Sequence, residues 1–295
     1  MREFREKIEN VFEYLMTLPS SIFILVMVLV PASYLLYLSG YQDTFNPINP
    51  PTFVGLQNFI NVSTDPVFWH QMGNTFIYVL GTVWIGLVLQ MLIAIALNDV
   101  QFGRFWQIIV LIPWAIPYVL SATFWKWMLN SQVGVINFIL VKIGILSEPI
   151  LFLGDRWLAM AFIILTEIWI QTPLSVVILL GGLKSIPQNM YPAAKMDGAN
   201  FFEQFRYVTL PYMRSTIMVT VSLQSMFLMR KMGTVFAMTK GGPGNQTEVI
   251  SIGIYNNLIN YGNVGYASAA GILLVVFTMI LVVVTTKIVQ PNFEK

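Results

Sequence analysis

Long hydrophobic segments alternate with polar loops along the chain. Three stretches, residues 22–38, 79–97 and 267–286, contain no Asp, Glu, Lys, Arg or His. A transmembrane helix needs about 20 consecutive, mostly apolar residues. The pattern therefore predicts an all-α integral membrane protein with six transmembrane helices. The six predicted spans lie near residues 19–40, 73–97, 107–129, 157–181, 215–238 and 266–289.

The composition supports this prediction and excludes several functions. Of 295 residues, 56% are hydrophobic and only 10% are charged, whereas about a quarter of a soluble domain is charged. The expected partner is therefore the lipid bilayer. The net charge is only +2 and the basic residues are dispersed, so we expect no binding to nucleic acid. Cysteine is absent and His70 is the single histidine, so we expect neither a metal site nor an enzyme.

The first 18 residues are expected to form a separate segment. Apolar residues recur at helical spacing from Phe4 to Leu15, which predicts a short amphipathic helix on the cytoplasmic membrane surface. Basic residues before a hydrophobic stretch also begin secretory signals, but here the stretch is too long and no Ala-x-Ala cleavage site follows. We therefore divide the chain into segment 1–18 and a six-helix transmembrane domain, 19–295.

The distribution of Lys and Arg predicts the orientation in the membrane. The connection 41–71 contains neither residue, whereas the N-terminus, the loop 182–213 and the C-terminus are basic. Cytoplasmic loops carry an excess of Lys and Arg. Both termini and the loop 182–213 are therefore predicted to be cytoplasmic, although Lys142 and Arg156 lie on the outer side.

Three prolines fall within the third and fourth predicted spans. Pro113 and Pro117 interrupt the third span and Pro173 the fourth, and each removes a backbone donor and is expected to bend its helix. Such breaks persist in a bilayer where neighbouring helices or a cavity satisfy the freed carbonyl groups. A packing kink would explain any one of them, but three near one depth favour a transport pathway.

The loop 182–213 contains small residues at a fixed spacing. Ala193 and Ala194 would let a short helix sit in a groove of another protein, and Gly198 permits the turn that ends it. The spacing resembles the coupling motif of ABC importer permeases, which is Glu-Ala-Ala, three residues, Gly, nine residues, an aliphatic residue, any residue, and Leu-Pro. Pro192 stands where that family usually has Glu. The resemblance assigns ATPase coupling to Pro192, Ala193, Ala194, Asp197, Gly198, Leu210 and Pro211, with Pro211 expected to start the next span. An ordinary amphipathic loop helix is the alternative.

A second motif lies at the predicted outer end of the fifth span. Thr239-Lys240-Gly241-Gly242-Pro243 contains the residues of a compact turn. Thr247 and Glu248 follow, and Gly265-Tyr266-Ala267-Ser268-Ala269 opens the last span. Together with the coupling motif, this pattern resembles the carbohydrate-uptake branch of these permeases, the maltose and glycerol-3-phosphate type.

Ionisable residues at membrane depth are expected to be functional. Glu167 lies in the fourth span and the adjacent Arg230 and Lys231 lie in the fifth, and each costs about 2.5 to 3.5 kcal/mol at the centre of a span. Either Glu167 pairs with one cation as a structural element, or the three form a polar wall of the transport route. Neighbours in a helix diverge by about 100°, so we expect one cation to face a cavity and the other either to pair with Glu167 or to point between helices.

The resemblance adds further residues to this route, because relatives hold the sugar near mid-membrane between the corresponding third, fourth and fifth spans. Aromatic faces stack on sugar rings, and amide or cationic groups donate to hydroxyls. Ordinary helix packing is the alternative for the aromatic residues. The implied substrate pathway consists of Trp114, Tyr118, Glu167, Gln171, Leu174, Phe227, Arg230 and Lys231. Two cations where relatives often have neutral polar groups allow an anionic or an unusually polar substrate.

The resemblance implies a membrane-spanning permease subunit of an ATP-driven ABC importer for a sugar or sugar derivative, in the cytoplasmic (inner) membrane of a prokaryote. Its expected partners are a second homologous permease, two cytoplasmic ATPase subunits and an external solute-binding protein. ATP and Mg would bind the ATPase subunits, and no cofactor is expected on this chain. The alternative is an ion-coupled secondary transporter in which Glu167 binds the coupling proton.

Overall fold

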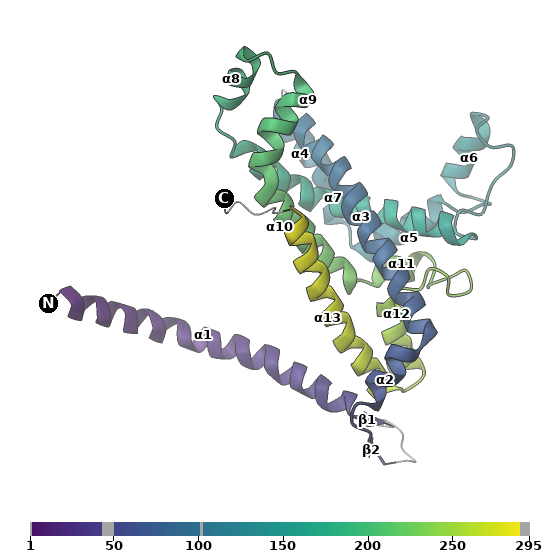
Figure 1. The fold of residues 1–295 in the computed structure, drawn as a ribbon. Helices are drawn as coiled ribbons and strands as arrows, with labels where there is room; N and C mark the ends of the chain where they lie inside the picture. Colours follow the sequence, from purple (N-terminus) through teal and green to yellow (C-terminus); the bar gives the residue numbers. More distant parts are fainter. Residues whose placement is uncertain (1, 43–49, 101–102, 290–295) are drawn as a thin grey trace. The chain divides into compact units, whose positions relative to one another are not determined.

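The structure is a computed structural model that describes residues 2–42, 50–100 and 103–289. These residues are mostly helical, with one small two-stranded sheet (Figure 1). The chain divides into two compact units, Met1–Asp65 with Ile254–Leu273, and Pro66–Gly253 with Leu274–Lys295. Each unit is described separately.

The first unit joins a long helix to a short antiparallel hairpin. Tyr41 pairs with Phe53 across the two strands, and their rings lie 5.3 Å apart. Asn58 fixes the next helix to this corner, because its side-chain amide donates to the carbonyl groups of Ser39 at 2.9 Å and Tyr41 at 3.0 Å. The elements are α1 (Arg2–Ser39), β1 (Tyr41–Gln42), β2 (Thr52–Phe53), α2 (Gln57–Thr64), the end of α12 (Ile250–Tyr255), the π-helix η3 (Asn256–Asn260) and the start of α13 (Val264–Val289).

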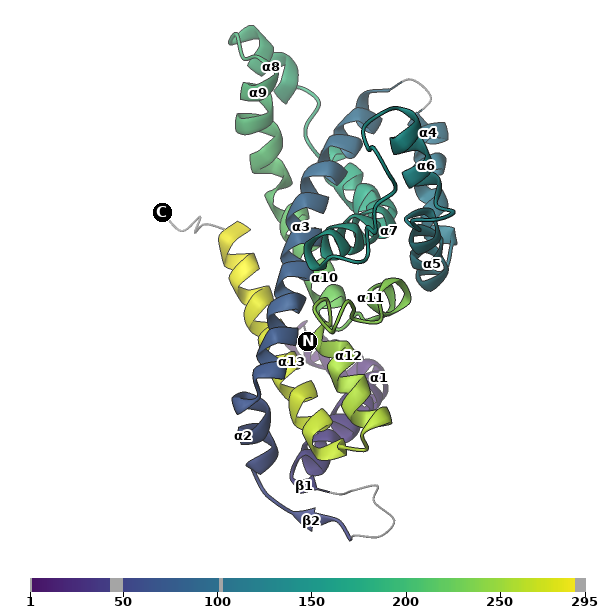
Figure 2. The same ribbon diagram turned by 90° about the vertical axis from the view of Figure 1, so that its right-hand side faces the viewer.

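The second unit is a helical bundle. Its long helices α3, α7 and α10 pack against one another (Figures 1 and 2), and Phe277 of α13 makes edge-to-face contacts with Trp69 and Phe76 of α3. Tyr78 and Leu179 are among the large side chains buried in its core. Besides parts of α12 and α13, the elements are α3 (Pro66–Asp99), α4 (Gly103–Leu111), the 3-10 helix η1 (Ile112–Ala115), α5 (Tyr118–Met128), α6 (Val135–Lys142), α7 (Arg156–Lys184), α8 (Met190–Met196), α9 (Phe201–Gln204), the π-helix η2 (Phe205–Thr209), α10 (Leu210–Met229) and α11 (Gly233–Met238).

The helices agree with a multi-span membrane protein. Four helical stretches in the described residues are long and apolar enough to cross a bilayer, at Met16–Ser39, Pro66–Asn98, Arg156–Lys184 and Val264–Ile288. A bent pair makes up to a fifth. The remaining predicted span, residues 215–238, corresponds to α10 and α11.

The prolines act differently in the two predicted spans. Phe105–Ala115 and Tyr118–Met128 meet at an angle of 92°, because Pro117 takes an extended ψ of 130° just before α5. This confirms the expected interruption of the third span. Pro173 instead lies buried inside α7 without ending it.

The fifth predicted span differs from the sequence prediction at one point and agrees with it at another. α10 ends at Met229 and α11 begins at Gly233, so residues 215–238 do not form one straight helix. Pro211 is the second residue of α10, as expected, although α9 and η2 lead into α10 without a gap. The wide π turn, which ends at Thr209, accommodates a proline ring that would clash with the carbonyl group four residues earlier in an ordinary α-helix.

The N-terminal helix has no boundary at residue 18. α1 runs from Arg2 to Ser39 and contains Pro19 and Pro31. The side chains of residues 2–15 lie outside the described part of the chain, so the amphipathic surface helix stays a prediction.

Candidate functional site

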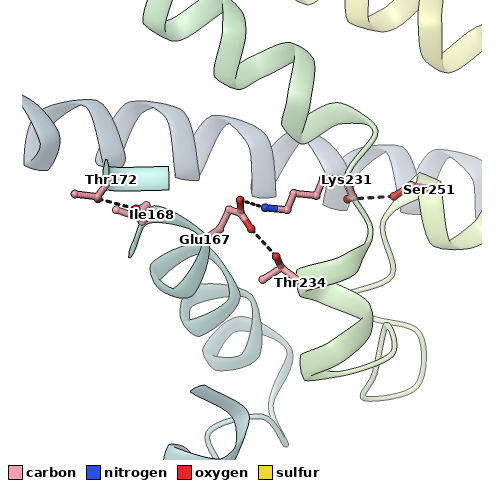
Figure 3. Close-up of polar contacts among 6 residues, drawn as sticks. All are labelled: Glu167, Ile168, Thr172, Lys231, Thr234 and Ser251. Atoms are coloured by element: carbon pink, nitrogen blue, oxygen red, sulfur yellow. Dashed lines mark hydrogen bonds and ion pairs between the residues drawn. The ribbon is translucent and has the colours of Figure 1, made fainter. Parts of the chain in front are cut away.

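An ion pair connects α7 to the break between α10 and α11. Lys231 Nζ lies 2.5 Å from Glu167 Oε1, and the Glu167 side chain is fully buried while that of Lys231 is 16% exposed. Thr234 donates its hydroxyl to the other carboxylate oxygen, Oε2, at 2.6 Å (Figure 3). The structure therefore has one of the two adjacent cations paired with Glu167, as the sequence analysis expected.

The break after α10 places the lysine at this position. Arg230 has φ −100° and ψ −3° at the end of α10, and Lys231 still donates its backbone N–H to the Leu228 carbonyl at 3.1 Å. The hydroxyl of Ser251 in α12 donates to the Lys231 carbonyl at 3.3 Å (Figure 3). Both backbone polar groups of Lys231 are thus hydrogen-bonded although no helix continues through it.

A pocket of about 520 Å³ opens beside the ion pair. We call it the cationic pocket. Its lining residues are Tyr118, Val119, Thr123, Arg230, Lys231, Met232, Gly233, Phe236, Ala237 and Lys240. It brings together Tyr118, Arg230 and Lys231 from the predicted pathway. The sequence analysis missed Lys240, Thr234 and Phe236 as members of this region.

The other predicted pathway residues lie outside the lining of the cationic pocket. Trp114 is exposed on η1, and Phe227 lies under the Arg230 guanidinium, whose Cζ is 5.3 Å from the ring centroid. Gln171 and Leu174 follow Glu167 by four and seven residues in α7. Residues at this spacing share one face of a helix. The structure therefore places the two residues of α7 on the side of the helix that carries Glu167.

A second polar contact lies within the bundle of α3, α7 and α10. The side-chain amide of Gln224 donates to Gln90 Oε1 at 3.0 Å and to Ser175 Oγ at 2.6 Å, and all three residues are buried. Uncharged side chains inside a long hydrophobic pattern gave no signal of this contact in the sequence.

The loop 182–213, which we call the coupling loop, forms two short helices beside the start of α10. Pro192, Ala193 and Ala194 lie in α8, and Asp197 and Gly198 end it, with Gly198 at φ +84°. This positive φ confirms the turn expected at Gly198.

Hydrogen bonds stabilise both short helices, α9 and α8. Asn200 and Glu203 form a capping box at the start of α9, with each side chain bonded to the other residue's backbone N–H. The hydroxyl groups of Tyr191 in α8 and Thr209 in η2 lie 3.0 Å apart. Leu210 and Pro211 follow Thr209 as the first residues of α10. Both views show α8 and α9 at the N-terminal end of α10 (Figures 1 and 2).

The surface of this loop is unusually apolar. Met196 is 85% exposed, Phe202 80% and Tyr207 70%. A groove of about 610 Å³ lies beside them, lined in part by Tyr191, Lys195 and Phe205. Contiguous exposed apolar side chains mark interaction sites.

These features define a membrane transport component with a docking loop. The chain belongs to the family described as "Binding-protein-dependent transport system inner membrane component", which matches residues 86–295. It is a multi-pass permease subunit of an ABC importer, and it is a translocation subunit rather than an enzyme.

Individual relatives agree with this assignment. The chain is 35% identical over 277 residues to the trehalose/maltose transport system permease protein MalF of Thermococcus litoralis, covering 93% of this chain and 92% of the relative. It is 28% identical to the sulfoquinovosyl glycerol transport system permease protein SmoG of Agrobacterium fabrum, covering 96% and 92%. A chain in the crystal structure of a bacterial ABC transporter that imports the acidic polysaccharide alginate has the same fold, with a TM-score of 0.80, 22% identity and full coverage of both chains.

Proposed function

We propose that the solute carried by this importer is a sugar or sugar derivative. The observation that carries the proposal is the similarity, over nearly the whole chain, to permeases of transport systems for trehalose/maltose and sulfoquinovosyl glycerol. The geometry is compatible with it, because the cationic pocket combines the Tyr118 ring with hydrogen-bond donors. Carbohydrate recognition uses both kinds of group.

The complex would contain a second homologous permease, an external solute-binding protein and two cytoplasmic ATPase subunits. ATP and Mg would bind the ATPase subunits, and this chain would bind no cofactor. The exposed apolar loop supports an ATPase contact, since Met196 and Phe202 otherwise leave a large apolar surface in water. Pro192 would reduce the charged part of that contact, because it cannot supply the carboxylate that the family motif usually has.

α10 would transmit movement between the two sites. Its 20 residues correspond to about 30 Å of α-helix. The coupling loop lies at one end, where Tyr191 contacts Thr209, and Arg230 of the cationic pocket lies at the other. Closure of the ATPase subunits would displace α8, and α10 would carry the displacement to the pocket.

The substrate route would pass the cationic pocket. Glu167 would hold Lys231 in place, and Arg230 would face the solute. Trp114, Gln171, Leu174 and Phe227 would line the route beyond the pocket.

The chain would lie in the cytoplasmic membrane of a prokaryote with both termini in the cytoplasm. The orientation rests on the excess of Lys and Arg in the loop 182–213 and at the termini. The family description, which names an inner membrane component, agrees with this location.

The ion-coupled alternative is not favoured. The chain belongs to a binding-protein-dependent family, and Glu167 is ion-paired with Lys231. A proton-binding carboxylate would have to leave that pair in each cycle.

Purification of the tagged chain from its own host tests the proposal. We expect an ATPase and a homologous permease in the complex, and we expect deletion of the chain to abolish uptake of at least one labelled sugar. An ion-gradient requirement without an ATPase would contradict it.

A further inference from the structure

We propose that the cationic pocket selects a sugar that carries an ionised acid group. This inference rests on the proposed function, because it narrows the substrate from sugars in general to acidic sugars. Three cations, Arg230, Lys231 and Lys240, line one pocket of about 520 Å³. Pockets of about 300 to 1,000 Å³ bind small molecules.

The three cations have different charge environments. Lys231 is neutralised by Glu167. Arg230 and Lys240 are exposed, and Arg230 lies over the Phe227 ring. Among the residues that the structure describes, the pocket therefore carries two positive charges without a carboxylate partner.

One of those charges, that of Arg230, lies where a cation is costly. Arg230 is fifteen residues from Ser215 in the sequence, which is about 22 Å along a helix and past the middle of a bilayer. A charge near the centre of a span costs about 2.5 to 3.5 kcal/mol. An anionic solute would offset this cost each time it occupied the pocket, whereas a neutral sugar would leave the charge of Arg230 unbalanced.

Lys240 is held beside the pocket by its backbone. It has a positive φ of 55°, which few residues other than Gly, Asn and Asp adopt. Its N–H donates to the Phe236 carbonyl at 3.1 Å, and the Thr247 hydroxyl donates to the Gly242 carbonyl at 2.6 Å. The Gly-Gly-Pro motif, interpreted from sequence as an external turn, therefore also positions a charge.

The aromatic part of the pocket favours a sugar-borne acid over a free anion. The Tyr118 ring lies against Gly233, where a side chain would overlap it, and Lys231 Nζ is 4.9 Å from the ring centroid. This ring is thus fixed beside the cations and can stack on a sugar face while Arg230 binds a carboxylate in bidentate fashion. Inorganic phosphate or sulfate has no such face.

Uptake by whole cells tests the inference. The host, with and without the gene, would be given a ¹³C-labelled hydrolysate of plant and algal polysaccharides that contains neutral and uronic-acid sugars. Mass spectrometry would identify the sugars whose uptake requires the chain. We expect acidic sugars, and we expect a hundredfold excess of inorganic phosphate to leave their uptake unchanged.

Variants would connect that uptake to the pocket. Arg230→Gln and Lys240→Gln should each lower acidic-sugar uptake by at least about tenfold, because a hydrogen bond between charged groups is lost. Lys126→Gln is the matched control, since Lys126 is an exposed cation on α5 that does not line the pocket. Recovery of the assembled complex would be measured for every variant.

The outcomes separate this inference from the proposed function. If only neutral sugars require the chain for uptake, the inference is overturned and the proposed function stands. If no sugar requires the chain for uptake, both the inference and the proposed function are overturned. Acidic-sugar uptake could also require the chain and yet be unchanged in the two assembled variants, or be abolished by inorganic phosphate. Either result would contradict selection of acidic sugars by the pocket.

Discussion

The hydroxyl groups of Tyr191 and Thr209 lie 3.0 Å apart and join α8 to the π-helix that precedes α10. This hydrogen bond is partly buried and connects residues 18 apart in the sequence. It gives the coupling loop a direct attachment to the helix that ends at the cationic pocket.

Removal of this attachment should weaken coupling. Tyr191→Phe and Thr209→Val each remove one hydroxyl, and a hydrogen bond contributes about 1 kcal/mol net. We expect uptake to fall by about two- to fivefold in reconstituted vesicles, with assembly unchanged and ATP hydrolysis retained. Tyr212→Phe is the control, because Tyr212 is exposed. Equal uptake in all three variants would contradict a role of the bond in coupling.

Gly198 should be sensitive to replacement although it has space for a side chain. Apart from its two chain neighbours, no residue has a heavy atom within 4 Å of the position that a Cβ atom would occupy there. However, φ is +84°, where a β-branched residue is strongly disfavoured. Gly198→Val should therefore distort the turn after α8 and uncouple ATP hydrolysis from uptake. Gly181→Ala in α7 has equal space and no positive φ, so it should behave as wild type.

The small residues of α8 allow a separate test of docking. Ala193→Glu with Ala194→Glu places two bulky carboxylates on the proposed contact with the ATPase. We expect loss of uptake and of solute-stimulated ATP hydrolysis, with membrane insertion intact. If both activities survive in reconstituted vesicles, the coupling assignment is wrong.

The ion pair should behave as a structural unit. Lys231→Met leaves the fully buried Glu167 side chain without its cation, and breaking a buried pair costs about 3 to 5 kcal/mol. We expect low yield and a lower melting temperature of the complex. Glu167→Gln combined with Lys231→Met should recover most of the loss, since no charge is then left unpaired. A double variant as unstable as Lys231→Met would contradict this explanation.

The orientation can be tested by single-cysteine labelling, because the chain contains no cysteine. Cysteines introduced at the exposed positions Thr52 and Gln246 should react with an impermeant maleimide on intact cells. A cysteine at Met196 should react only after the membrane is opened. Labelling of position 196 on intact cells would reverse the predicted topology.

The sequence predicted features whose cause is local. Pro117 interrupts the third span because proline fixes its own φ and removes a donor. Gly198 ends α8 because glycine adopts the positive φ of this turn without a steric penalty. The motif spacing likewise placed Ala193 and Ala194 on a short helix. None of these features needs a distant contact.

The features that the sequence did not predict depend on contacts between distant segments. Residues 215–238 are mostly hydrophobic and were predicted as one span. The break after Met229 accompanies an ion pair between Lys231 and Glu167, 64 residues apart. Pro173 remains inside α7, where it is buried in the packed bundle. Lys240 lines the pocket because the turn after α11 places it there. Its closeness in sequence to Arg230 and Lys231 was a signal from which it could have been predicted.

The π-helix at Phe205–Thr209 shifts the angular positions of the residues before it, around the helix axis, relative to those of the residues after it. A π turn holds one more residue than an α turn, and one residue is about 100° of rotation. The exposed Phe202 and the buried Met213 are therefore out of phase with a single helical wheel drawn from residue 201 to residue 229. Deleting one residue from this turn would restore the regular α-helical phase. It would also rotate the coupling loop by about a quarter of a circle relative to α10.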